Sequence, residues 1–580
     1  MFHLWRKNKE ELYPIGKEIP LKESDDYRFL DSITVHALKT GRTRMMILAS
    51  IFTIAFCLIG LRLFEQTVLK QNIHSPHKST LSMVSPVKRA NIVDRNGHIL
   101  ATSLPIVNLY VDARYMPHPN ELAKALLSVF PDMNKEDLMS KLKSQKAFEY
   151  LRRNLTPEEQ YAVNRLGYPQ LNFDASERRV YPQSGLFSHL LGFTNVDNEG
   201  IAGLEMQYDK RLTESEEPLV LSVDVRIQET VHSILSAAVQ KFKADGAVSL
   251  VVDVQNAEIL AMVSLPDFDL NQTPITPTLN KASVGMYELG SVMKPFTVAI
   301  GLESKSITTA SKIEAFSPYK LAKRRTITDF QAENRVLNVP EVLIYSSNIG
   351  TAKIALMFGP ATQKEFLNRF HFLSKLDIDL PEVGRPIVQK KWDDVETATI
   401  SYGYGLSVSP LHLVSGFRAL IDGGYYLLPT FLKDGNKDAP YEQVLSEKTS
   451  KQMRHMLRGV VEIGSGKRAN IKGYNVIGKT GTAQMQDDRG RYIEGKVRTS
   501  FIGAFPIDNP KYIVYVMIEN PAKRKEDWNF NTAGWNSCPT GGQIIEAIAP
   551  ILGVEPKEDV AKPAYMESAY DYIREKKKKR

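Results

Sequence analysis

Residues 289–303 read LGSVMKPFTVAIGLE, in which a glycine and a serine lead into a segment with the pattern of a helix that has an apolar face. Within it, Ser291 and Lys294 form an S-x-x-K motif, whose spacing places both side chains on one face of a helix. Pro295 suits the first turn of that helix, where a missing N–H costs little. A partly desolvated lysine beside a serine loses its proton and acts as general base for the hydroxyl. The stretch therefore predicts Ser291 as a nucleophile and Lys294 as its base.

The S-x-x-K motif is weak evidence by itself, because the chain contains further matches that begin at Ser75, Ser85, Ser140 and Ser317. Three of these serines precede a proline, and the fourth lies in a charge-rich segment. At Ser291, by contrast, the motif opens a helix with an apolar face. Context therefore selects Ser291.

A second motif, S-x-N, lies downstream in VLIYSSNIGTAKIALMFG, residues 342–359. Ser346 and Asn348 occupy an expected turn between two helices. A hydroxyl and an amide at such a turn can relay a proton and hold a peptide group. Helix capping is the alternative, because serine and asparagine commonly cap helices.

A third motif, K-T-G, lies in YNVIGKTGTAQ, where Lys479, Thr480, Gly481 and Thr482 belong to an expected strand. Side chains two residues apart in a strand point to the same side, so Lys479 and Gly481 share a face. Glycine also lets an extended peptide come close to the backbone. The same tripeptide begins at Lys39, so the motif gains its weight from its place after the other two.

S-x-x-K, S-x-N and K-T-G in this order form the signature of penicillin-binding proteins and serine β-lactamases. The chain resembles the class B penicillin-binding proteins, which are membrane-anchored peptidoglycan D,D-transpeptidases. The resemblance spans about residues 45 to 552 and includes VKRANIVDRNGHILATS, ISYGYGLSVSPLHL and RTSFIGAFPIDNP. A short pedestal and its GIAGLE segment look more like the septal type, penicillin-binding protein 3, than the elongation type. Leu289 and Ala90 depart from the proline and glycine that the family commonly has.

The resemblance implies a two-step acyl transfer. Ser291 would attack a stem peptide that ends in D-Ala-D-Ala and release the last D-Ala, after which an amine of a neighbouring stem would take the acyl group. Lys294 would be the base of acylation and Ser346 would pass the proton to the leaving amine. Asn348 would hold the substrate amide. β-Lactams would acylate Ser291 as substrate mimics.

The K-T-G segment would bind the substrate. Lys479 would place a positive charge near the substrate carboxylate and Ser346, while the hydroxyls of Thr480 and Thr482 would bind that carboxylate. Gly481 completes the substrate-binding set. The backbone N–H groups of Ser291 and Thr482 would form the oxyanion hole. This chemistry requires no metal and no cofactor.

Residues 45–61, MMILASIFTIAFCLIGL, carry no charge and are typical of a membrane helix. Lys39, Arg42 and Arg44 precede them, so the positive-inside rule predicts a cytoplasmic N-terminus and an extracytoplasmic remainder. The expected location is the inner membrane, with one span and a periplasmic catalytic domain. A cleaved signal peptide and a buried soluble helix are the alternatives.

Composition excludes several classes of protein. The 580 residues, 43% apolar and 24% charged, suit a globular chain of several units, and a mean hydropathy of −0.25 excludes a polytopic membrane protein. The two cysteines, Cys57 and Cys538, exclude a disulfide framework and a thiolate zinc site. The net charge of +8 is modest for this length, and no basic motif supports a nucleic-acid partner.

The expected fold class is α+β: one N-terminal transmembrane helix, an elongated mixed pedestal and a C-terminal penicillin-binding transpeptidase domain. The resemblance gives that domain an antiparallel sheet with helices on both faces and a helical subdomain. The expected parts are a cytoplasmic tail at residues 1–44, an anchor at 45–64, a pedestal at 75–225, a transpeptidase domain at 235–555 and a basic C-terminal tail at 556–580. The last five residues of that tail, KKKKR, look like a solvated end, and contact with an anionic membrane or wall polymer is the alternative.

Local patterns add detail to these parts. Asn96 and Gly97 between two apolar runs predict a hairpin with a type I′ turn. Residues 121–166 look helical and rich in charge. Residues 247–266 look like two paired strands with a turn at 255–257.

By family, the expected partners are a membrane glycan polymerase and other division proteins. Three other functions stay open. A β-lactamase or carboxypeptidase would share the motifs, but the anchor and the pedestal argue against both. A non-catalytic β-lactam-binding scaffold or sensor would not need every reactive side chain. An elongation-type transpeptidase would differ in partner and not in chemistry.

Overall fold

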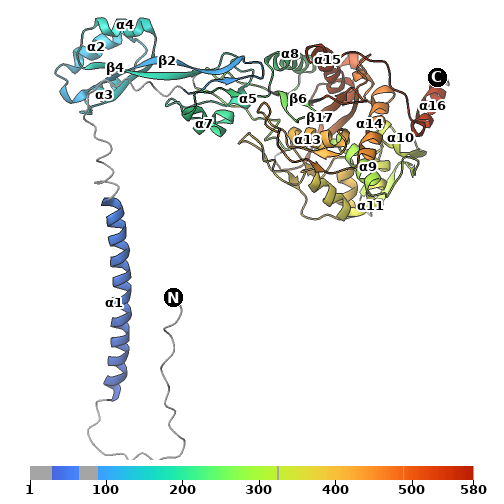
Figure 1. Cartoon of the computed structure of the whole chain (residues 1–580), viewed down its shortest axis with the longest axis horizontal. Coiled ribbons are helices and arrows are strands. Elements are labelled where there is room, and N and C mark those ends of the chain that lie inside the picture. The colour runs from blue at the N-terminus through green and yellow to red at the C-terminus, as the bar shows by residue number, and fades with distance from the viewer. Residues whose placement is uncertain (1–28, 65–88, 273, 323–324, 488, 579–580) are drawn as a thin grey trace, which may run out of the picture. The chain divides into compact units, whose positions relative to one another are not determined.

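The structure, a computed structural model, describes residues 29–64, 89–272, 274–322, 325–487 and 489–578 (Figure 1). The chain divides into two compact units, residues 1–83 and 84–580.

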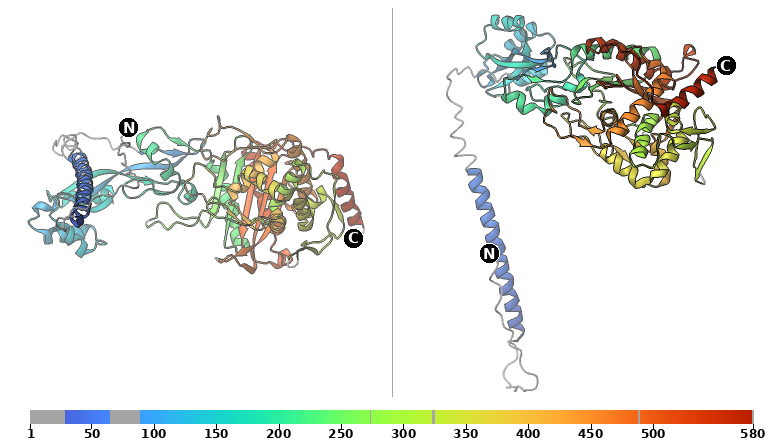
Figure 2. Two further views of the ribbon diagram at one scale, coloured as in Figure 1. Left: turned by 90° about the horizontal axis from the view of Figure 1, so that it is seen from below. Right: turned by 45° about the vertical axis from the view of Figure 1, so that its right-hand side comes forward.

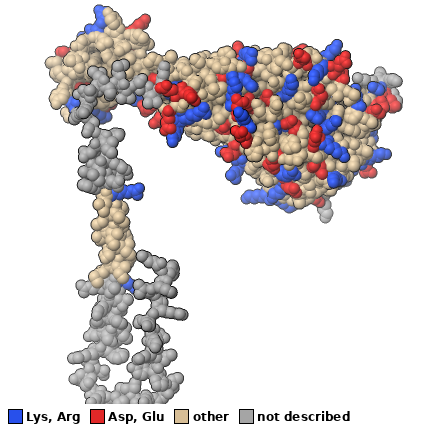
Figure 3. Space-filling view, in the orientation of Figure 1, with Lys and Arg blue, Asp and Glu red and all other residues tan. Residues whose placement is uncertain are grey.

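The first unit contains one long helix, α1 (Phe29–Phe64). Its stretch Arg44–Arg62 has a mean hydropathy of 2.1 and is not buried against protein; Figure 3 shows it as uncharged side chains between two basic ends. Among the described residues, α1 is the one helix long and apolar enough to cross a membrane. The single N-terminal apolar helix of the predicted fold class is thus confirmed. Residues 1–28 of the predicted tail lie outside the described residues.

The second unit begins with a pedestal built on two long antiparallel strands, β2 (Ile99–Val111) and β4 (Leu171–Val180). At one end of this pair a small lobe with its own apolar core consists of β3 (Glu149–Leu155), α2 (Pro119–Val129), α3 (Lys135–Leu142) and α4 (Pro157–Arg165) (Figure 1). At the other end lie β1 (Ile92–Val93), β5 (Leu219–Val220), α5 (Ser188–Leu191), α6 (Gly203–Gln207) and α7 (Asp209–Glu214). The pedestal therefore has two ends with separate cores.

Two local predictions for the pedestal need correction. The hairpin between β1 and β2 is present, but Gly97 has a positive φ (+88°) and Asn96 does not, so the turn is not type I′. The reason is the Asp94 carboxylate, which accepts hydrogen bonds from the backbone of Asn96 and His98 and holds a longer loop. In addition, β3 lies within residues 121–166, because pairing with β2 outweighs the local helical pattern.

A buried ionic cluster holds the pedestal end that faces the predicted transpeptidase domain. Arg89 and Glu205 are completely buried, and their charged atoms lie 2.7 Å apart. Arg179 reaches the other oxygen of Glu205 at 2.7 Å, and Asp209 pairs with Arg89. Buried charges are tolerated when they are paired and hydrogen-bonded, so these segments are locked together.

The transpeptidase domain is built around an antiparallel sheet of five strands in the order β16-β17-β18-β6-β7. Their bounds are Ile477–Gln486, Tyr492–Phe505, Tyr512–Glu519, Gly246–Asp253 and Ile259–Leu265. The β6–β7 pair matches the two strands predicted at 247–266. One face packs against α8 (Val225–Phe242) and α15 (Ser537–Ile551) (Figure 2). The other packs against α9 (Lys294–Glu303), α13 (Pro410–Ile421) and α14 (Glu447–Glu462), which confirms the predicted layers.

Further helices form the predicted helical subdomain around α9: α10 (Val339–Ile344), α11 (Asn348–Arg369) and α12 (Asp394–Ser401). Small antiparallel pairs border it, formed by β8 (Lys312–Glu314) with β11 (Val336–Asn338), β9 (Tyr319–Ala322) with β10 (Arg325–Ile327), β12 (Ile387–Val388) with β13 (Leu406–Ser407), and β14 (Tyr425–Tyr426) with β15 (Glu442–Gln443). Short 3-10 turns are η3 (Ala113–Tyr115), η4 (Gly290–Met293), η5 (Lys467–Ala469), η6 (Lys525–Asp527) and η7 (Ala533–Trp535).

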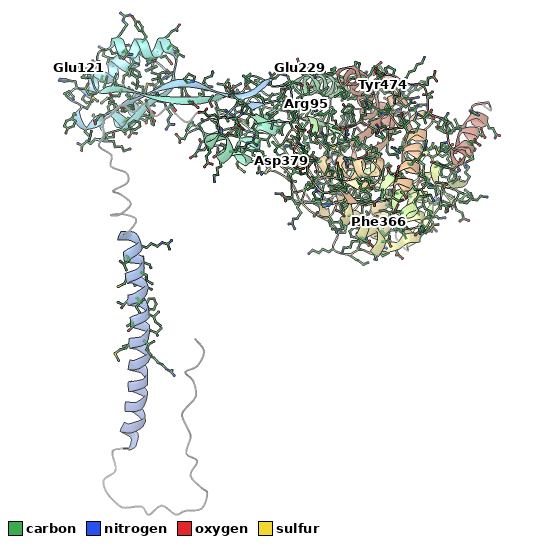
Figure 4. The ribbon with its side chains drawn as sticks, viewed as in Figure 1. Arg95, Glu121, Glu229, Phe366, Asp379 and Tyr474 are labelled. Atoms are coloured by element: carbon green, nitrogen blue, oxygen red, sulfur yellow. The ribbon has the colours of Figure 1, made fainter. Side chains whose placement is uncertain are left out.

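Asp379 connects the pedestal to the transpeptidase domain. Its carboxylate accepts hydrogen bonds from Tyr208 Oη at 2.8 Å and from Thr430 Oγ1 at 2.6 Å (Figure 4). Nearby, the backbone N–H of Gly203 donates to Glu382 at 2.9 Å. The junction is therefore polar as well as apolar.

The C-terminal segment, predicted only as a basic tail, contains a helix. Residues Ala564–Lys578 form α16, and Met566 and Ala569 on this helix are 1% and 0% exposed. Apolar side chains spaced three apart place one stripe of the helix on the domain core. The basic side chains at its very end lie outside the described residues.

Candidate functional site

Ser291 lies in η4, the tight turn that leads into α9. Gly290 has a φ of +58°, and a Cβ atom there would come within 2.7 Å of the Thr482 carbonyl oxygen. Only glycine fits such a conformation and such a close approach without strain. Of the four residues in the turn, Ser291 alone is not buried. The turn therefore presents the serine next to strand β16 while its neighbours anchor it in the core.

Two lysines converge on the hydroxyl of Ser346. Lys294 is the first residue of α9, and its Nζ donates to Ser346 Oγ at 3.1 Å and to the Ser346 carbonyl oxygen. Lys479 in β16 donates from Nζ to the same Oγ at 2.9 Å and to the Thr480 carbonyl oxygen at 3.0 Å. Both lysine side chains are 0% exposed. The structure thus joins all three motifs at one oxygen atom.

Burial changes the acid–base properties of both lysines. It lowers the pKa of Lys294 well below the usual lysine value, and the positive charge of Lys479 lowers this pKa further. Burial also lowers the pKa of Lys479 to about 7. Lys294 is thereby favoured as a neutral amine, the form that takes up a proton.

Ser346 occupies the turn between α10 and α11, as its motif predicted, and has a φ of +56°. This left-handed conformation is uncommon for residues other than glycine and costs about 1–3 kcal/mol unless the surroundings enforce it. The hydrogen bonds from Lys294 to the carbonyl oxygen and hydroxyl of Ser346 contribute to that enforcement.

Asp329 is a site residue that the motifs did not reveal. Its carboxylate accepts hydrogen bonds from Ser347 Oγ at 2.6 Å and from the backbone N–H groups of Asn348 at 2.5 Å and Ile349 at 3.0 Å. A carboxylate at the N-terminus of α11 also complements the helix dipole. No local pattern in the sequence could identify this aspartate, because it lies in a separate loop after β10. The Asn348 side chain donates to the Thr328 carbonyl oxygen at 2.8 Å.

Strand β16 forms one edge of the sheet, and its free edge borders the serine turn. A Cβ atom on Gly481 would lie 2.6 Å from the Leu289 carbonyl oxygen. The absence of a side chain at this position therefore allows the serine turn to approach the strand. Thr480 Oγ1 lies 2.6 Å from Ser465 Oγ. Thr482 Oγ1 accepts a hydrogen bond from the backbone N–H of Ala533 at 3.1 Å.

The remaining S-x-x-K matches lie away from these groups or outside the described residues. Ser140 is in α3 of the pedestal lobe, and Ser317 is in the loop before β9. Ser75 and Ser85 belong to residues that the structure does not describe. Within the described ranges, no cluster of three or more His, Cys, Asp or Glu residues is arranged to hold a metal ion.

Comparisons with known proteins identify the family of this chain. The model of the penicillin binding protein transpeptidase domain matches residues 247–533, and that of the penicillin-binding protein dimerisation domain matches residues 84–232. A probable peptidoglycan D,D-transpeptidase FtsI of Caulobacter vibrioides is 37% identical over 489 residues, which cover 81% of this chain and 82% of the relative. The chain belongs to the class B penicillin-binding proteins, of the FtsI type.

Other relatives of this penicillin-binding protein agree. The peptidoglycan D,D-transpeptidase FtsI of Escherichia coli is 29% identical and covers 81% of this chain and 84% of its own. The transpeptidase domain of penicillin-binding protein 3 from Burkholderia pseudomallei has a TM-score of 0.53 at 32% identity and covers 58% of this chain and 98% of that structure. A peptidoglycan synthetase from Bifidobacterium adolescentis shares the fold, with a TM-score of 0.67 at 19% identity, over 82% of this chain and 97% of that one. The resemblance drawn from the motifs is confirmed.

In this penicillin-binding protein, Glu288 ties the serine turn to two other segments. Its carboxylate accepts hydrogen bonds from the backbone N–H of Gly405 at 2.6 Å and from Tyr492 Oη at 3.0 Å. Burial raises the pKa of this carboxyl group. Sequence reasoning missed Glu288, although it directly precedes the Leu-Gly-Ser segment. No local signal could have identified it, because its burial and its partners Gly405 and Tyr492 depend on segments far away in the chain.

Proposed function

We propose that this protein is the D,D-transpeptidase that cross-links peptidoglycan stem peptides through an acyl-serine at Ser291. The convergence of two fully buried lysines on Ser346 Oγ carries the proposal, together with Ser291, which is not buried and precedes Lys294 by three residues. A neutral Lys294 takes the proton of Ser291 Oγ as this oxygen bonds to the carbonyl carbon of the penultimate D-Ala. The carbon–nitrogen bond then breaks, and the terminal D-Ala leaves.

Ser346 delivers the proton that the leaving amine needs. Its oxygen accepts hydrogen bonds from Lys294 and Lys479, so its own hydrogen is left to point toward the substrate. The proton lost by Ser291 thus returns through Lys294 and Ser346 to the amine of D-Ala. In the second step the amine of a neighbouring stem peptide attacks the acyl-serine, and the proton transfers run in reverse.

The free edge of β16 receives the substrate as an added strand. The backbone N–H of Gln484 points outward from the sheet at this edge and donates to Tyr404 Oη at 3.4 Å. Because N–H groups two residues apart in a strand point to the same side, the N–H of Thr482 points to this edge as well. It forms the oxyanion hole with the N–H of Ser291. Lys479 and the hydroxyls of Thr480 and Thr482 bind the substrate carboxylate.

Labelling with a fluorescent penicillin tests the nucleophile. The full-length protein in detergent should take one covalent label, and Ser291→Ala should take none. Ser317→Ala is the matched control, because it removes the serine of another S-x-x-K match, and it should label like the wild type. Label on the Ser291→Ala variant would show that the nucleophile is a different residue.

We also propose a septal role, with the catalytic domain in the periplasm. The basic residues before Arg44–Arg62 favour a cytoplasmic N-terminus. The names of the FtsI relatives support the septal assignment. Expected partners are a membrane glycan polymerase and other division proteins that contact the pedestal. Depletion in the native cell should produce filaments, whereas rounded cells would indicate an elongation-type enzyme.

A further inference from the structure

The C-terminal helix α16 packs on α10, the short helix that leads to Ser346 (Figure 1). Ser568 of α16 accepts a hydrogen bond from Asn338 Nδ2 at 2.7 Å. Asn338 also caps α10, because its Oδ1 accepts from the backbone N–H of Glu341 at 2.9 Å. Two residues before Ser568 in α16, Met566 packs where Ile344, the last residue of α10, meets α14. Helix α16 therefore contacts both ends of α10.

An aromatic and cationic stack adds a third contact. The guanidinium of Arg335 lies 3.9 Å from the ring centre of Tyr572 in α16 and 5.5 Å from that of Tyr345. The two tyrosine rings meet edge to face with centres 6.2 Å apart. Arg335 also forms an ion pair with Glu341 of α10 at 2.8 Å. Each such contact is modest, but together they link α16 to the residue directly before Ser346.

The position of Tyr345 makes these contacts relevant to the active site. Ser346 follows it directly and holds a left-handed backbone conformation that its surroundings must enforce. Movement of Tyr345 would displace both acceptor atoms of Ser346 that Lys294 uses. A displacement of about 1 Å from a change remote from the chemistry can reduce a rate on the order of 100-fold.

We propose that α16 is a positioning element for the reaction, which holds α10 and Tyr345 so that Ser346 stays within reach of Lys294 and Lys479. The inference rests on the proposed function, in which Ser346 relays a proton. Ser568, Met566 and Tyr572 are positioning residues, because they act through α10 and do not touch the reacting atoms.

Acylation kinetics of the full-length protein with a chromogenic cephalosporin test the proposal. Tyr572→Ala and a chain ending at Pro563 should lower the acylation rate constant on the order of 10-fold. The non-covalent dissociation constant should change little, because Ser346 acts in proton transfer. Tyr572→Phe removes the hydrogen bond from Tyr572 Oη to Glu333 at 3.0 Å but keeps the ring on Arg335, so it should acylate at close to the wild-type rate.

A matched control separates positioning from general stability. Val554 is a buried residue of the core on the opposite face of the sheet, so Val554→Ala should lower the unfolding midpoint and leave the acylation rate constant unchanged. Hydrogen exchange provides a second measurement. Deuterium uptake in residues 339–347 should rise in Tyr572→Ala and not in Val554→Ala.

The possible results are distinct. An unchanged acylation rate constant and unchanged uptake in Tyr572→Ala would overturn the positioning role of α16, as would an equal loss of rate in Val554→Ala. If the shortened chain does not fold, the comparison of Tyr572→Ala with Tyr572→Phe still tests whether α16 positions α10. A wild type that is not acylated would contradict the proposed function itself, while the hydrogen exchange result would still test the contact.

Discussion

At the scale of single residues, the three motifs meet at Ser346 Oγ. One of the groups there, the amine of Lys479, should control by its titration how fast the enzyme binds and reacts with a substrate that carries a carboxylate. Its pKa of about 7 means that a rise in pH through neutrality removes its positive charge. The second-order rate constant for acylation by a carboxylate-bearing β-lactam should therefore fall above about pH 7. Lys479→Arg keeps its charge at all these pH values, so stopped-flow profiles of that variant should lack the alkaline decline, whatever its absolute rate. A decline of the same shape in both proteins would assign the titration to another group.

Asp329 is the second residue with a testable role. Its carboxylate accepts three hydrogen bonds at the start of α11. A hydrogen bond to a charged group contributes about 1.5–3 kcal/mol to the stability of the folded protein. Asp329→Asn should lower the free energy of unfolding by about 2 kcal/mol and slow acylation, because the Ser346 turn loosens. Urea unfolding and penicillin labelling measure the two effects. Asp137→Asn, on an exposed pair with Lys141, should change neither.

At the scale of elements, the approach of η4 to β16 depends on Gly290. Gly290→Ala should destabilise the domain by more than about 1 kcal/mol, because a positive φ and a close contact act together. It should also slow acylation by moving Ser291 from the strand edge. Gly97→Ala measures the loss of stability that comes from the positive φ alone. This hairpin glycine has a φ of +88°, but nothing lies within 4 Å of the added Cβ. Equal losses of stability in the two variants, measured by thermal unfolding, would show that the contact with Thr482 contributes nothing.

At the scale of the whole molecule, the buried pair of Arg89 and Glu205 holds the pedestal end next to the catalytic domain. Arg89→Ala would leave Arg179 to face Glu205 and Asp209 alone, so the cluster would carry one uncompensated negative charge and the pedestal should lose about 3–5 kcal/mol of stability. Chemical unfolding followed by limited proteolysis would detect this loss. Arg114→Ala removes an exposed partner of Asp112 and should leave the unfolding curve unchanged. A small effect of Arg89→Ala would mean that water enters the cluster and solvates Glu205.

The sequence alone was sufficient for features whose physical cause is local. A run of uncharged residues specifies the long apolar helix, and the short, fixed spacings of the three motifs single out Ser291, Lys294, Ser346 and Lys479 as candidates for the site. Likewise, the β6–β7 hairpin follows from alternation around one turn. The roles of Asp329, Glu288 and α16 were not recognisable, because each depends on contacts between segments far apart in the chain. Such contacts depend on which faces of the helices and strands pack together. They also depend on which polar groups become buried and need a hydrogen-bond partner. Only the tertiary structure decides these two things.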